Sequence, residues 1–255
     1  MASTDHIEET GTPQIAIIGN PNVGKSTIFN YLTGLNQKIG NYPGVTVDKK
    51  TGTLQIQGES FEILDLPGTY SLFPNSEDEI IAHRVLNNPE LEKRPDYVLL
   101  VIDSTQLSRG LFLATQLIDL GINLTILLNM ADLAAAKNIE IRSYELFKRL
   151  GVPILQTDAR NQKGLEQIKE LIQQRNFSKA PQFVDILEVV PASLLDQVKE
   201  KFDLENHYQA YQMIRFGAKD KAISEEKRNW LAQVLEENKF NLEEVQLEET
   251  KIRYK

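Results

Sequence analysis

The sequence of 255 residues contains no cysteine. This absence excludes disulfides, thiolate metal sites and cysteine nucleophiles, and it fits a reducing compartment. No apolar run approaches the ~18 residues that a membrane-spanning helix needs. Basic residues are in deficit, with 28 Lys and Arg against 36 Asp and Glu and a net charge of −8. Because phosphate neutralisation needs clustered cations, we expect no nucleic-acid partner.

Repeats and low-complexity tracts are also absent, and the composition, 41% hydrophobic and 25% charged, is that of an ordinary globular protein. The length predicts one large domain or two modest ones. Residues 1–12 are polar and lack the apolar region of a signal peptide, so we expect a flexible leader there. The chain as given is predicted to be cytosolic.

The most informative segment is Gly19-Asn20-Pro21-Asn22-Val23-Gly24-Lys25-Ser26. It fits the phosphate-loop pattern of two glycines at fixed spacing followed by lysine and a hydroxyl residue. An apolar run typical of a buried strand precedes it, and residues 27–32 are typical of the first turns of a helix. In this order the backbone N–H groups surround one spot that favours negative charge. The segment therefore predicts a phosphate-binding site.

The residue types in this loop each have a chemical reason. Gly24 lets the backbone approach a phosphate without a Cβ in the way. Lys25 supplies a mobile cation for the β- and γ-phosphates, and Ser26 offers a hydroxyl to Mg²⁺. We predict that the nucleotide is contacted by Gly19, Asn20, Pro21, Asn22, Val23, Gly24, Lys25, Ser26 and Thr27.

Apolar runs alternate with helical patterns up to about residue 175. Strands are predicted at 14–18, 50–57, 61–64, 97–103, 124–129 and 154–156, and helices at 25–33, 78–86, 109–120, 143–150 and 164–173. Alternation of this kind predicts an α/β fold with a mostly parallel sheet covered on both faces. The strands at 50–57 and 61–64 are joined by a short turn at Gly58-Glu59, which predicts an antiparallel hairpin at the sheet edge.

Strand-like runs stop after about residue 176. Beyond a linker at 178–181, apolar residues recur at helical spacing, and Gly217 and Asn238 lie where helices could end. We therefore predict an α/β domain that carries the phosphate loop over residues 13–176 and a small all-helical domain over 177–255.

Two further segments are candidates for the γ-phosphate and Mg²⁺. Asp65-Leu66-Pro67-Gly68 ends a predicted strand, where Asp65 can hold Mg²⁺ through water and the Gly68 N–H can bond a γ-phosphate. Glycines and a proline within 38–48 mark a flexible segment that can order on a γ-phosphate and release after hydrolysis. There we predict nucleotide contacts from Gly44, Val45 and Thr46, with Thr46 as the second Mg²⁺ ligand.

The identity of the base depends on Asn129-Met130-Ala131-Asp132, which ends a predicted strand. The Asp132 carboxylate can accept two N–H bonds from the guanine N1 and N2 edge, which adenine cannot supply. The alternative role for this aspartate is to cap a helix, and the two roles are compatible. Asn129 and Met130 are assigned to the same site, with the unbranched stem of Met130 lying along the base.

A last nucleotide segment, Thr157-Asp158-Ala159-Arg160, follows the sixth predicted strand. GTPases usually carry Ser-Ala-Lys here, and the alanine N–H bonds the guanine O6. Ala159 and Arg160 fit this pattern. Asp158 replaces the serine, where it could brace the loop through local side-chain-to-backbone bonds. The alternative is an ordinary loop before the final predicted helix of this domain, which would have a similar sequence.

These segments resemble the ferrous iron transport protein B (FeoB) family. The specific parts are the string Asn41-Tyr42-Pro43-Gly44-Val45-Thr46 and the methionine after Asn129. The resemblance implies the cytosolic GTPase region of a bacterial ferrous iron transporter, on the cytoplasmic face of the cell membrane. It implies GTP and GDP as ligands, a membrane permease region in the same polypeptide, and room for oligomers through that region. It also implies that residues 13–176 form a Ras-like P-loop GTPase domain, and that the helical domain restrains GDP release and relays the nucleotide state.

The resemblance also implies Mg²⁺, and a K⁺ ion supported by Asn22, which would supply positive charge near the phosphates. Asn22 could instead only brace the loop. Lys25, Asn22, Thr46 and Gly68 are the predicted catalytic residues. Thr69 stands where Ras-like GTPases carry a water-orienting glutamine, and it is too short for that role, so we expect slow hydrolysis.

Two other functions share these nucleotide segments. A ribosome-assembly GTPase would add a basic RNA-binding module, whereas the region after residue 176 is rich in glutamate. A switch that binds GTP without hydrolysing it is the third hypothesis, and phosphate release would separate it from the others. The histidines His6, His83 and His207 do not cluster, so we assign no iron site.

Overall fold

The structure is a computed structural model that describes residues 11–34, 37–41, 48–74, 76–87, 94–218, 220 and 222–254. Its framework is a seven-stranded sheet with strand order β2-β3-β4-β1-β5-β6-β7. The strands are β1 (Gln14–Gly19), β2 (Gln37–Asn41), β3 (Asp48–Ile56), β4 (Glu59–Asp65), β5 (Tyr97–Asp103), β6 (Leu124–Asn129) and β7 (Ile154–Gln156).

The pairings confirm the predicted mostly parallel sheet. β1 pairs in parallel with β4 and β5, and β6 pairs in parallel with β5 and β7, whereas β3 is antiparallel to β4 and to β2. The β3–β4 hairpin forms as predicted, with Ile56 paired to Glu59 around Gln57 and Gly58. Both turn residues have positive φ, 49° and 91°, as a two-residue hairpin turn requires.

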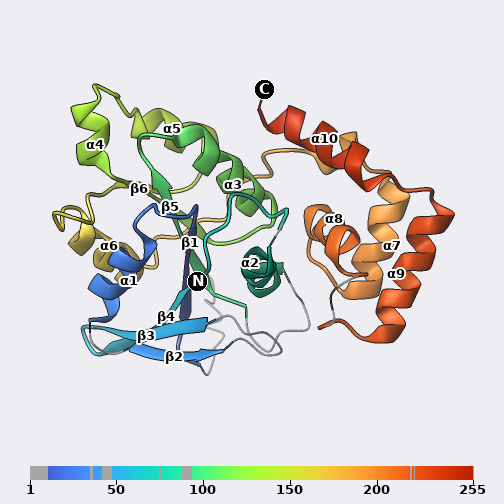
Figure 1. The fold of residues 1–255 in the computed structure, drawn as a ribbon, viewed down its shortest axis with the longest axis horizontal. Coiled ribbons are helices and arrows are strands. Elements are labelled where there is room, and N and C mark those ends of the chain that lie inside the picture. The colour runs from blue at the N-terminus through green and yellow to red at the C-terminus, as the bar shows by residue number, and fades with distance from the viewer. Residues whose placement is uncertain are drawn as a thin grey trace, which may run out of the picture.

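Helices cover both faces of the sheet (Figure 1). Side chains alternate along β1, so Ile15 and Ile17 join a cluster with α1 (Lys25–Thr33) and α6 (Leu165–Gln173), while Ile18 faces the opposite cluster. That opposite cluster contains residues of α2 (Glu77–Asn87), α3 (Leu107–Asp119) and α5 (Ser143–Leu150). The acidic run Glu77-Asp78-Glu79 forms the first turn of α2, as its charge predicts.

Two elements were not predicted. β2 occupies part of the segment expected to be flexible, and α4 (Ala131–Ala136) follows β6 directly. β2 gave no apolar alternation because it is an edge strand whose described side chains are exposed, Ile39 included at 72%. The predicted residues Gly44, Val45 and Thr46 lie outside the described residues.

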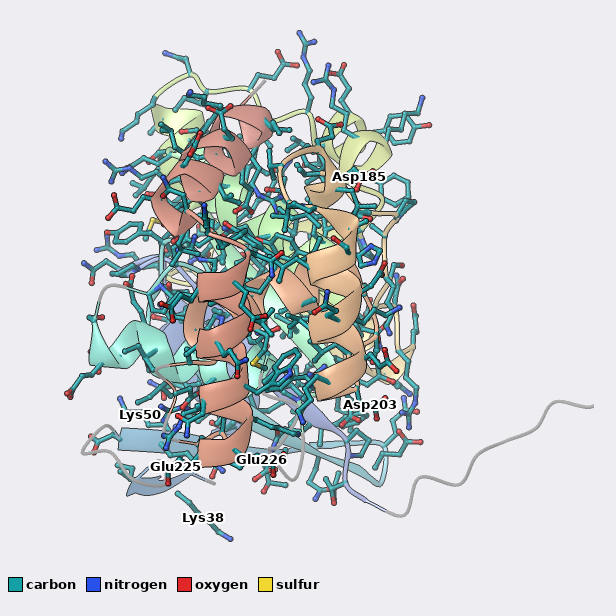
Figure 2. All side chains as sticks on the ribbon, turned by 90° about the vertical axis from the view of Figure 1, so that its right-hand side faces the viewer. Lys38, Lys50, Asp185, Asp203, Glu225 and Glu226 are labelled. Carbon is teal, nitrogen blue, oxygen red and sulfur yellow. The ribbon has the colours of Figure 1, made fainter. Side chains whose placement is uncertain are left out.

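The region after β7 and α6 is helical, as predicted. It contains a short 3₁₀ turn (Ile186–Glu188) and the helices α7 (Ala192–Phe202), α8 (His207–Phe216), α9 (Glu225–Glu237) and α10 (Leu242–Arg253). Gly217 and Asn238 are the C-caps of α8 and α9. Glu225 and Glu226, labelled in Figure 2, are the first two residues of α9. Among the residues that the structure describes, no helix is both long and apolar enough to span a membrane.

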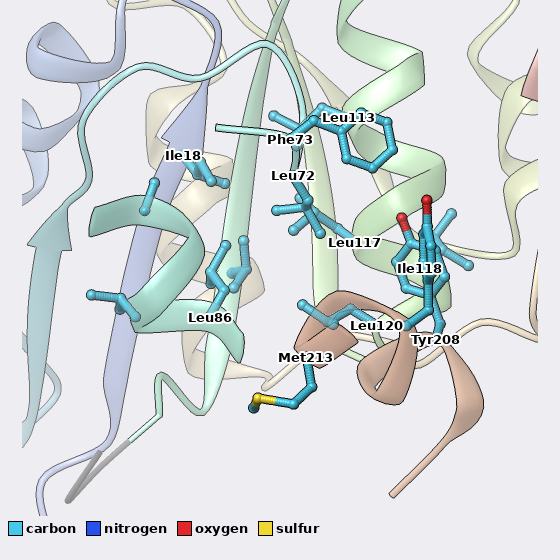
Figure 3. Packing of buried hydrophobic residues seen from close by; sticks show 14 of the residues in the cluster. Ile18, Leu72, Phe73, Leu86, Leu113, Leu117, Ile118, Leu120, Tyr208 and Met213 are labelled. Atoms are coloured by element: carbon cyan, nitrogen blue, oxygen red, sulfur yellow. The ribbon is translucent and has the colours of Figure 1, made fainter. Parts of the chain in front are cut away.

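The helical region shares one apolar core with the sheet. Leu72, Phe73 and Leu120 on the sheet side belong to the same buried cluster as Tyr208 and Met213 of α8 (Figure 3). Continuous burial of this kind resists separation of the two parts, because it would expose apolar surface to water. The boundary at residue 176 between a sheet domain and a helical domain therefore remains a prediction from the sequence.

A buried ion cluster also joins the two parts. Arg253 of α10 lies 2.7 Å from Asp119 of α3 and 2.9 Å from Glu249, and these side chains are fully buried. Tyr208 donates a hydrogen bond of 2.8 Å to Glu249. Asp119 also accepts the Phe183 N–H at 2.5 Å. Burial raises the pKa of Asp119, and the Arg253 guanidinium opposes that rise. The cluster fixes the last helix of the chain to the sheet domain.

Candidate nucleotide site

The predicted phosphate loop connects β1 to α1 at the edge where the parallel strands end. Gly24 immediately precedes α1 and has a φ of 94°. A Cβ at this position would lie 2.4 Å from the Asn129 side-chain nitrogen, so both the conformation and the space require glycine. The N-terminus of α1 is thereby free of side-chain obstruction, which suits a phosphate.

Lys25 is folded back over the loop. Its Nζ donates to the carbonyls of Gly19 at 3.1 Å and Asn20 at 2.8 Å. Burial lowers the pKa of Lys25 to about 8, and the Asp65 carboxylate partly opposes this. The Lys25 amine is thus held by two carbonyls of its own loop. The Asn20 Oδ1 atom is buried without a hydrogen-bond partner.

Ser26 and Asp65 form the candidate Mg²⁺ site. The Ser26 hydroxyl lies 3.4 Å from Asp65 Oδ2, and Asp65 Oδ1 is buried without a hydrogen-bond partner. Burial raises the pKa of Asp65, while Lys25, Lys50 and the Ser26 hydroxyl act in the opposite direction. Mg²⁺ is bound through hard oxygen ligands and usually keeps several waters. A hydroxyl beside a carboxylate with an unused oxygen fits that ion.

A cavity of about 610 Å³ opens at this point. Gly68 reaches it together with Lys25, and a Cβ on Gly68 would come within 3.0 Å of Pro21 and 3.1 Å of Lys25 Nζ. Leu66 is buried beneath the segment, and Pro67 is half-buried at the wall. The structure therefore brings the phosphate loop and the Asp65–Gly68 turn together, as the sequence predicted. Sequence reasoning missed Asp48, Lys50, Glu77 and Asp78, which line the same cavity.

Asn129 links the phosphate loop to the segments on the base side. Its amide donates to the Val23 carbonyl at 2.8 Å, and its Oδ1 accepts from the Ala159 N–H at 2.9 Å and the Thr157 hydroxyl at 3.2 Å. The side chain is buried. This bracing role went unnoticed in the sequence because it depends on residues 106 and 30 positions away.

Asp132 is the second residue of α4, and the helix is preceded by Met130, with a φ of 62° and no side-chain capping bond. The aspartate is therefore not the N-cap residue of α4. Asp132 is half-buried, and the N–H of the preceding residue, Ala131, is bonded to the Thr157 carbonyl at 3.2 Å. This bond holds the residues 129–132 beside the residues 157–160.

Asp158 braces its loop in the way that the sequence suggested. It is buried, and its carboxylate accepts the Asn161 N–H at 3.1 Å and the Asn161 side-chain amide at 2.7 Å. The Ala159 N–H is engaged with Asn129, so a guanine O6 would have to share or replace that bond. Arg160 is exposed next to it.

Three other predicted residues, two in the loop and one in α1, are exposed. Asn22 is exposed and adopts a left-handed conformation with a φ of 63°. Pro21 and Thr27 are exposed as well. Thr69, by contrast, is buried, and its hydroxyl donates to the Ser71 carbonyl at 2.6 Å. The Thr69 hydroxyl thus has its hydrogen-bond acceptor within the same turn.

The strand order, the loop between β1 and α1, and the polar ends of β4 and β6 define a GTPase-type nucleotide-binding fold, the G domain of P-loop GTPases. A family model described as ferrous iron transport protein B matches residues 13–172. The chain belongs to this family, and it carries the family's N-terminal G domain.

Relatives and solved structures agree with this assignment. The chain is 56% identical over 108 residues to the Fe(2+) transporter FeoB of Methanocaldococcus jannaschii, covering 42% of this chain and 16% of the relative. It resembles the cytosolic domain of FeoB from L. pneumophila with a TM-score of 0.76, at 31% identity over 94% of both chains. A mutant NFeoB from S. thermophilus bound to GDP gives a TM-score of 0.71, at 32% identity over 96% of both chains. The chain spans about a fifth of the length of the curated relatives that it matches.

Proposed function

We propose that this chain binds GTP and GDP, hydrolyses GTP slowly, and acts as the cytosolic, nucleotide-controlled regulator of a ferrous iron membrane transporter. The observation that carries the proposal is the convergence of Lys25, Ser26, Asp65 and Gly68 on one cavity in a G domain. The solved S. thermophilus relative bound to GDP supports the choice of nucleotide. The family match favours this function over a ribosome-assembly GTPase.

In the proposed complex the loop amides and Lys25 hold the β- and γ-phosphates. Ser26, Thr46 and, through water, Asp65 would hold Mg²⁺, which supplies charge neutralisation on the phosphates. Gly68 would present its N–H to the γ-phosphate. Asp132 would bind the guanine edge, and Asn129 would keep the phosphate and base segments in register through its bonds to Val23 and Ala159.

Slow hydrolysis follows from the state of Thr69. Its hydroxyl is bonded to Ser71 and its side chain is buried, so it is not available to orient an attacking water. Backbone groups would hold the water instead. In-line attack on the γ-phosphate depends mainly on positioning and charge neutralisation, and a missing orienting side chain costs rate.

The test of this function is phosphate release from GTP, compared between the unsubstituted chain and Lys25→Ala. We expect slow release that the substitution abolishes, together with retained folding by circular dichroism. GTP binding without any phosphate release would instead support a switch that does not hydrolyse its ligand.

K⁺ is proposed as a second ion, held near the phosphates with the help of Asn22. We expect faster hydrolysis in KCl than in NaCl at equal ionic strength, because K⁺ would add positive charge where negative charge develops. Asn22→Ala should remove the difference between the salts. Equal rates in the two salts for the unsubstituted chain would contradict the K⁺ proposal.

Proton uptake should accompany nucleotide binding. In the free chain the pKa of Lys25 is about 8, below its ordinary 10.5, so the ammonium is partly deprotonated above pH 8. Phosphates favour the charged form and raise that pKa on binding. We expect GDP binding to take up protons at pH 8.5, with affinity falling above pH 8. Calorimetry in buffers of different ionisation enthalpy measures the uptake, and a buffer-independent enthalpy at pH 8.5 would contradict it.

The proposed relay to the helical region begins at Phe73, in the segment between Gly68 and α2. The Arg215 guanidinium lies 4.0 Å from the ring centre of Phe73, and Phe73 packs edge-on against Phe112 at 6.1 Å. Phe112 in turn stacks on Tyr254 at 5.3 Å. A series of aromatic rings therefore runs from Phe73, in the segment after the Asp65–Gly68 turn, to Tyr254 at the end of α10.

Helix α2 makes a second, polar connection to the helical region. Arg84 forms an ion pair of 2.8 Å with Asp220. His83 is buried against Phe216, with ring centres 4.3 Å apart, and lies 3.3 Å from the Gln212 side-chain oxygen. Burial lowers the pKa of His83 to about 4, so the ring is neutral at pH 7. A shift of the γ-phosphate turn would have to move α2 and α8 together, which is how the nucleotide state would reach the transporter.

Phe73→Ala is expected to speed GDP release about five- to tenfold, because it removes the cation–π contact that ties the turn to α8. Release of a fluorescent GDP analogue in a stopped-flow instrument measures this. Phe177→Ala is the matched control, since Phe177 stacks on Tyr97 at 4.5 Å within the cluster on the other face of the sheet. We expect that control to lose stability without faster release. Equal acceleration in both variants would remove the relay.

A further inference from the structure

We propose that Lys50 of β3 reads the γ-phosphate and thereby sets the preference of this site for a nucleoside triphosphate over a diphosphate. The inference rests on the proposed function, because it assigns a specificity-determining residue within the same site. Lys50 lies outside the phosphate loop and the Asp65–Gly68 turn.

The register of the β3–β4 hairpin places Lys50 directly opposite Asp65. Directly opposed residues in an antiparallel pair project to the same face, with Cβ atoms ~4.5–5.5 Å apart. Further along the same two strands, Leu54 opposes Phe61, and both are buried in the cluster with α1. Since side chains alternate along a strand, Lys50 projects to the face that α1 covers. The first residues of α1 are Lys25 and Ser26.

Lys50 and the phosphate residues line one cavity of about 610 Å³, into which a γ-phosphate bound by Gly68 would extend. Lys50, which is labelled in Figure 2, is exposed at this cavity. Its long side chain can therefore place the ammonium over the cavity opening. The register of the β3–β4 hairpin and the lining of the cavity therefore both place the Lys50 ammonium on the outer side of Ser26 and Asp65, the candidate Mg²⁺ residues.

The charges around this cavity explain why a γ-phosphate needs a second cation. Among the described residues that line it, Lys25 and Lys50 are opposed by the carboxylates of Asp48, Asp65, Glu77 and Asp78. GDP would keep its phosphates within the loop amides and Lys25. A γ-phosphate would bring further negative charge towards the acidic wall, and Lys50 offsets that repulsion. The effect of Lys50 should therefore fall on GTP and spare GDP.

The experiment measures binding of GDP and of the non-hydrolysed analogue GMPPNP by calorimetry in the presence of Mg²⁺. For Lys50→Met we expect GMPPNP to bind about fivefold more weakly and GDP to stay within about twofold, since one charge at a partly exposed site has an effect of this order. The loss should shrink at high salt because the charges are screened. Lys50→Arg should retain the preference, and Lys50→Glu should lose about 25-fold for GMPPNP.

Lys49→Met is the matched control. It removes the same charge from the neighbouring residue of β3, which projects to the opposite side of the strand, so both affinities should remain unchanged. If Lys50→Met left the ratio of the GMPPNP and GDP affinities unchanged, the inference about Lys50 would be overturned and the proposed function would stand. Failure of the unsubstituted chain to bind either nucleotide would overturn the proposed function and this inference with it.

Discussion

Asp132→Ala is expected to lower the affinity for GDP and GTP by about two to four orders of magnitude. The carboxylate would accept two charge-assisted N–H bonds from guanine, and each such bond contributes about 1.5–3 kcal/mol. The residual affinity should distinguish guanine from adenine nucleotides much less, because the phosphate contacts are common to both. Calorimetric titration with GDP and ADP measures both effects.

The same substitution should leave the fold nearly unchanged. Asp132 lies one residue inside α4, and the residue that precedes the helix is Met130, so no capping bond is lost. Glu140→Ala, which removes an exposed acid beyond α4, is the control for net charge. A loss of about 1 kcal/mol in the free energy of unfolding with unchanged GDP affinity would assign Asp132 to helix stability instead.

Arg253→Met is expected to lower the free energy of unfolding by about 3–5 kcal/mol, because it leaves the buried carboxylates of Asp119 and Glu249 without their cation. Urea denaturation at pH 8 measures the loss. Without the guanidinium the folded-state pKa of Asp119 should rise further above its unfolded value. The penalty is then largest above that raised pKa and decreases as the pH falls, so the loss should be smaller at pH 5.

Lys251→Met offers a control on the same helix. Lys251 forms an ion pair of 2.7 Å with Glu248, but both side chains are about half exposed. Exposed pairs contribute ~0–1 kcal/mol, so little change is expected. Similar losses in the two variants would show that α10 as a whole, and not the buried cluster, determines this stability.

The parts of the fold that depend on local sequence were predicted closely. The apolar runs gave six strands of the sheet, and the expected hairpin has its two-residue turn at Gln57 and Gly58. Gly217 and Asn238 end helices as expected, because these residue types suit helix C-termini. β2 and α4 were missed, since an exposed edge strand and a six-residue helix carry little periodicity.

In the candidate site, too, the features that depend on short motifs were predicted, and those that depend on long-range contacts were missed. The phosphate loop and the Asp65–Gly68 turn follow from short motifs, and the structure brings them to one cavity. The bracing of the loop by Asn129 was not visible, because it joins residues far apart in the sequence. Lys50 could have been found by counting back through the hairpin from Gly58, which pairs it with Asp65. The buried Asp119–Arg253 pair depends on tertiary packing and has no local signal.

The central claim is that the cavity beside Lys25 takes a guanine nucleotide. Calorimetric titration of the unsubstituted chain with GTP, GDP and ATP in Mg²⁺ tests it most directly. The account predicts binding of GTP and GDP and at least a hundredfold weaker binding of ATP, since adenine lacks the N–H groups that Asp132 would accept. Equal affinity for ATP and GTP, or no binding of any of the three, would contradict it.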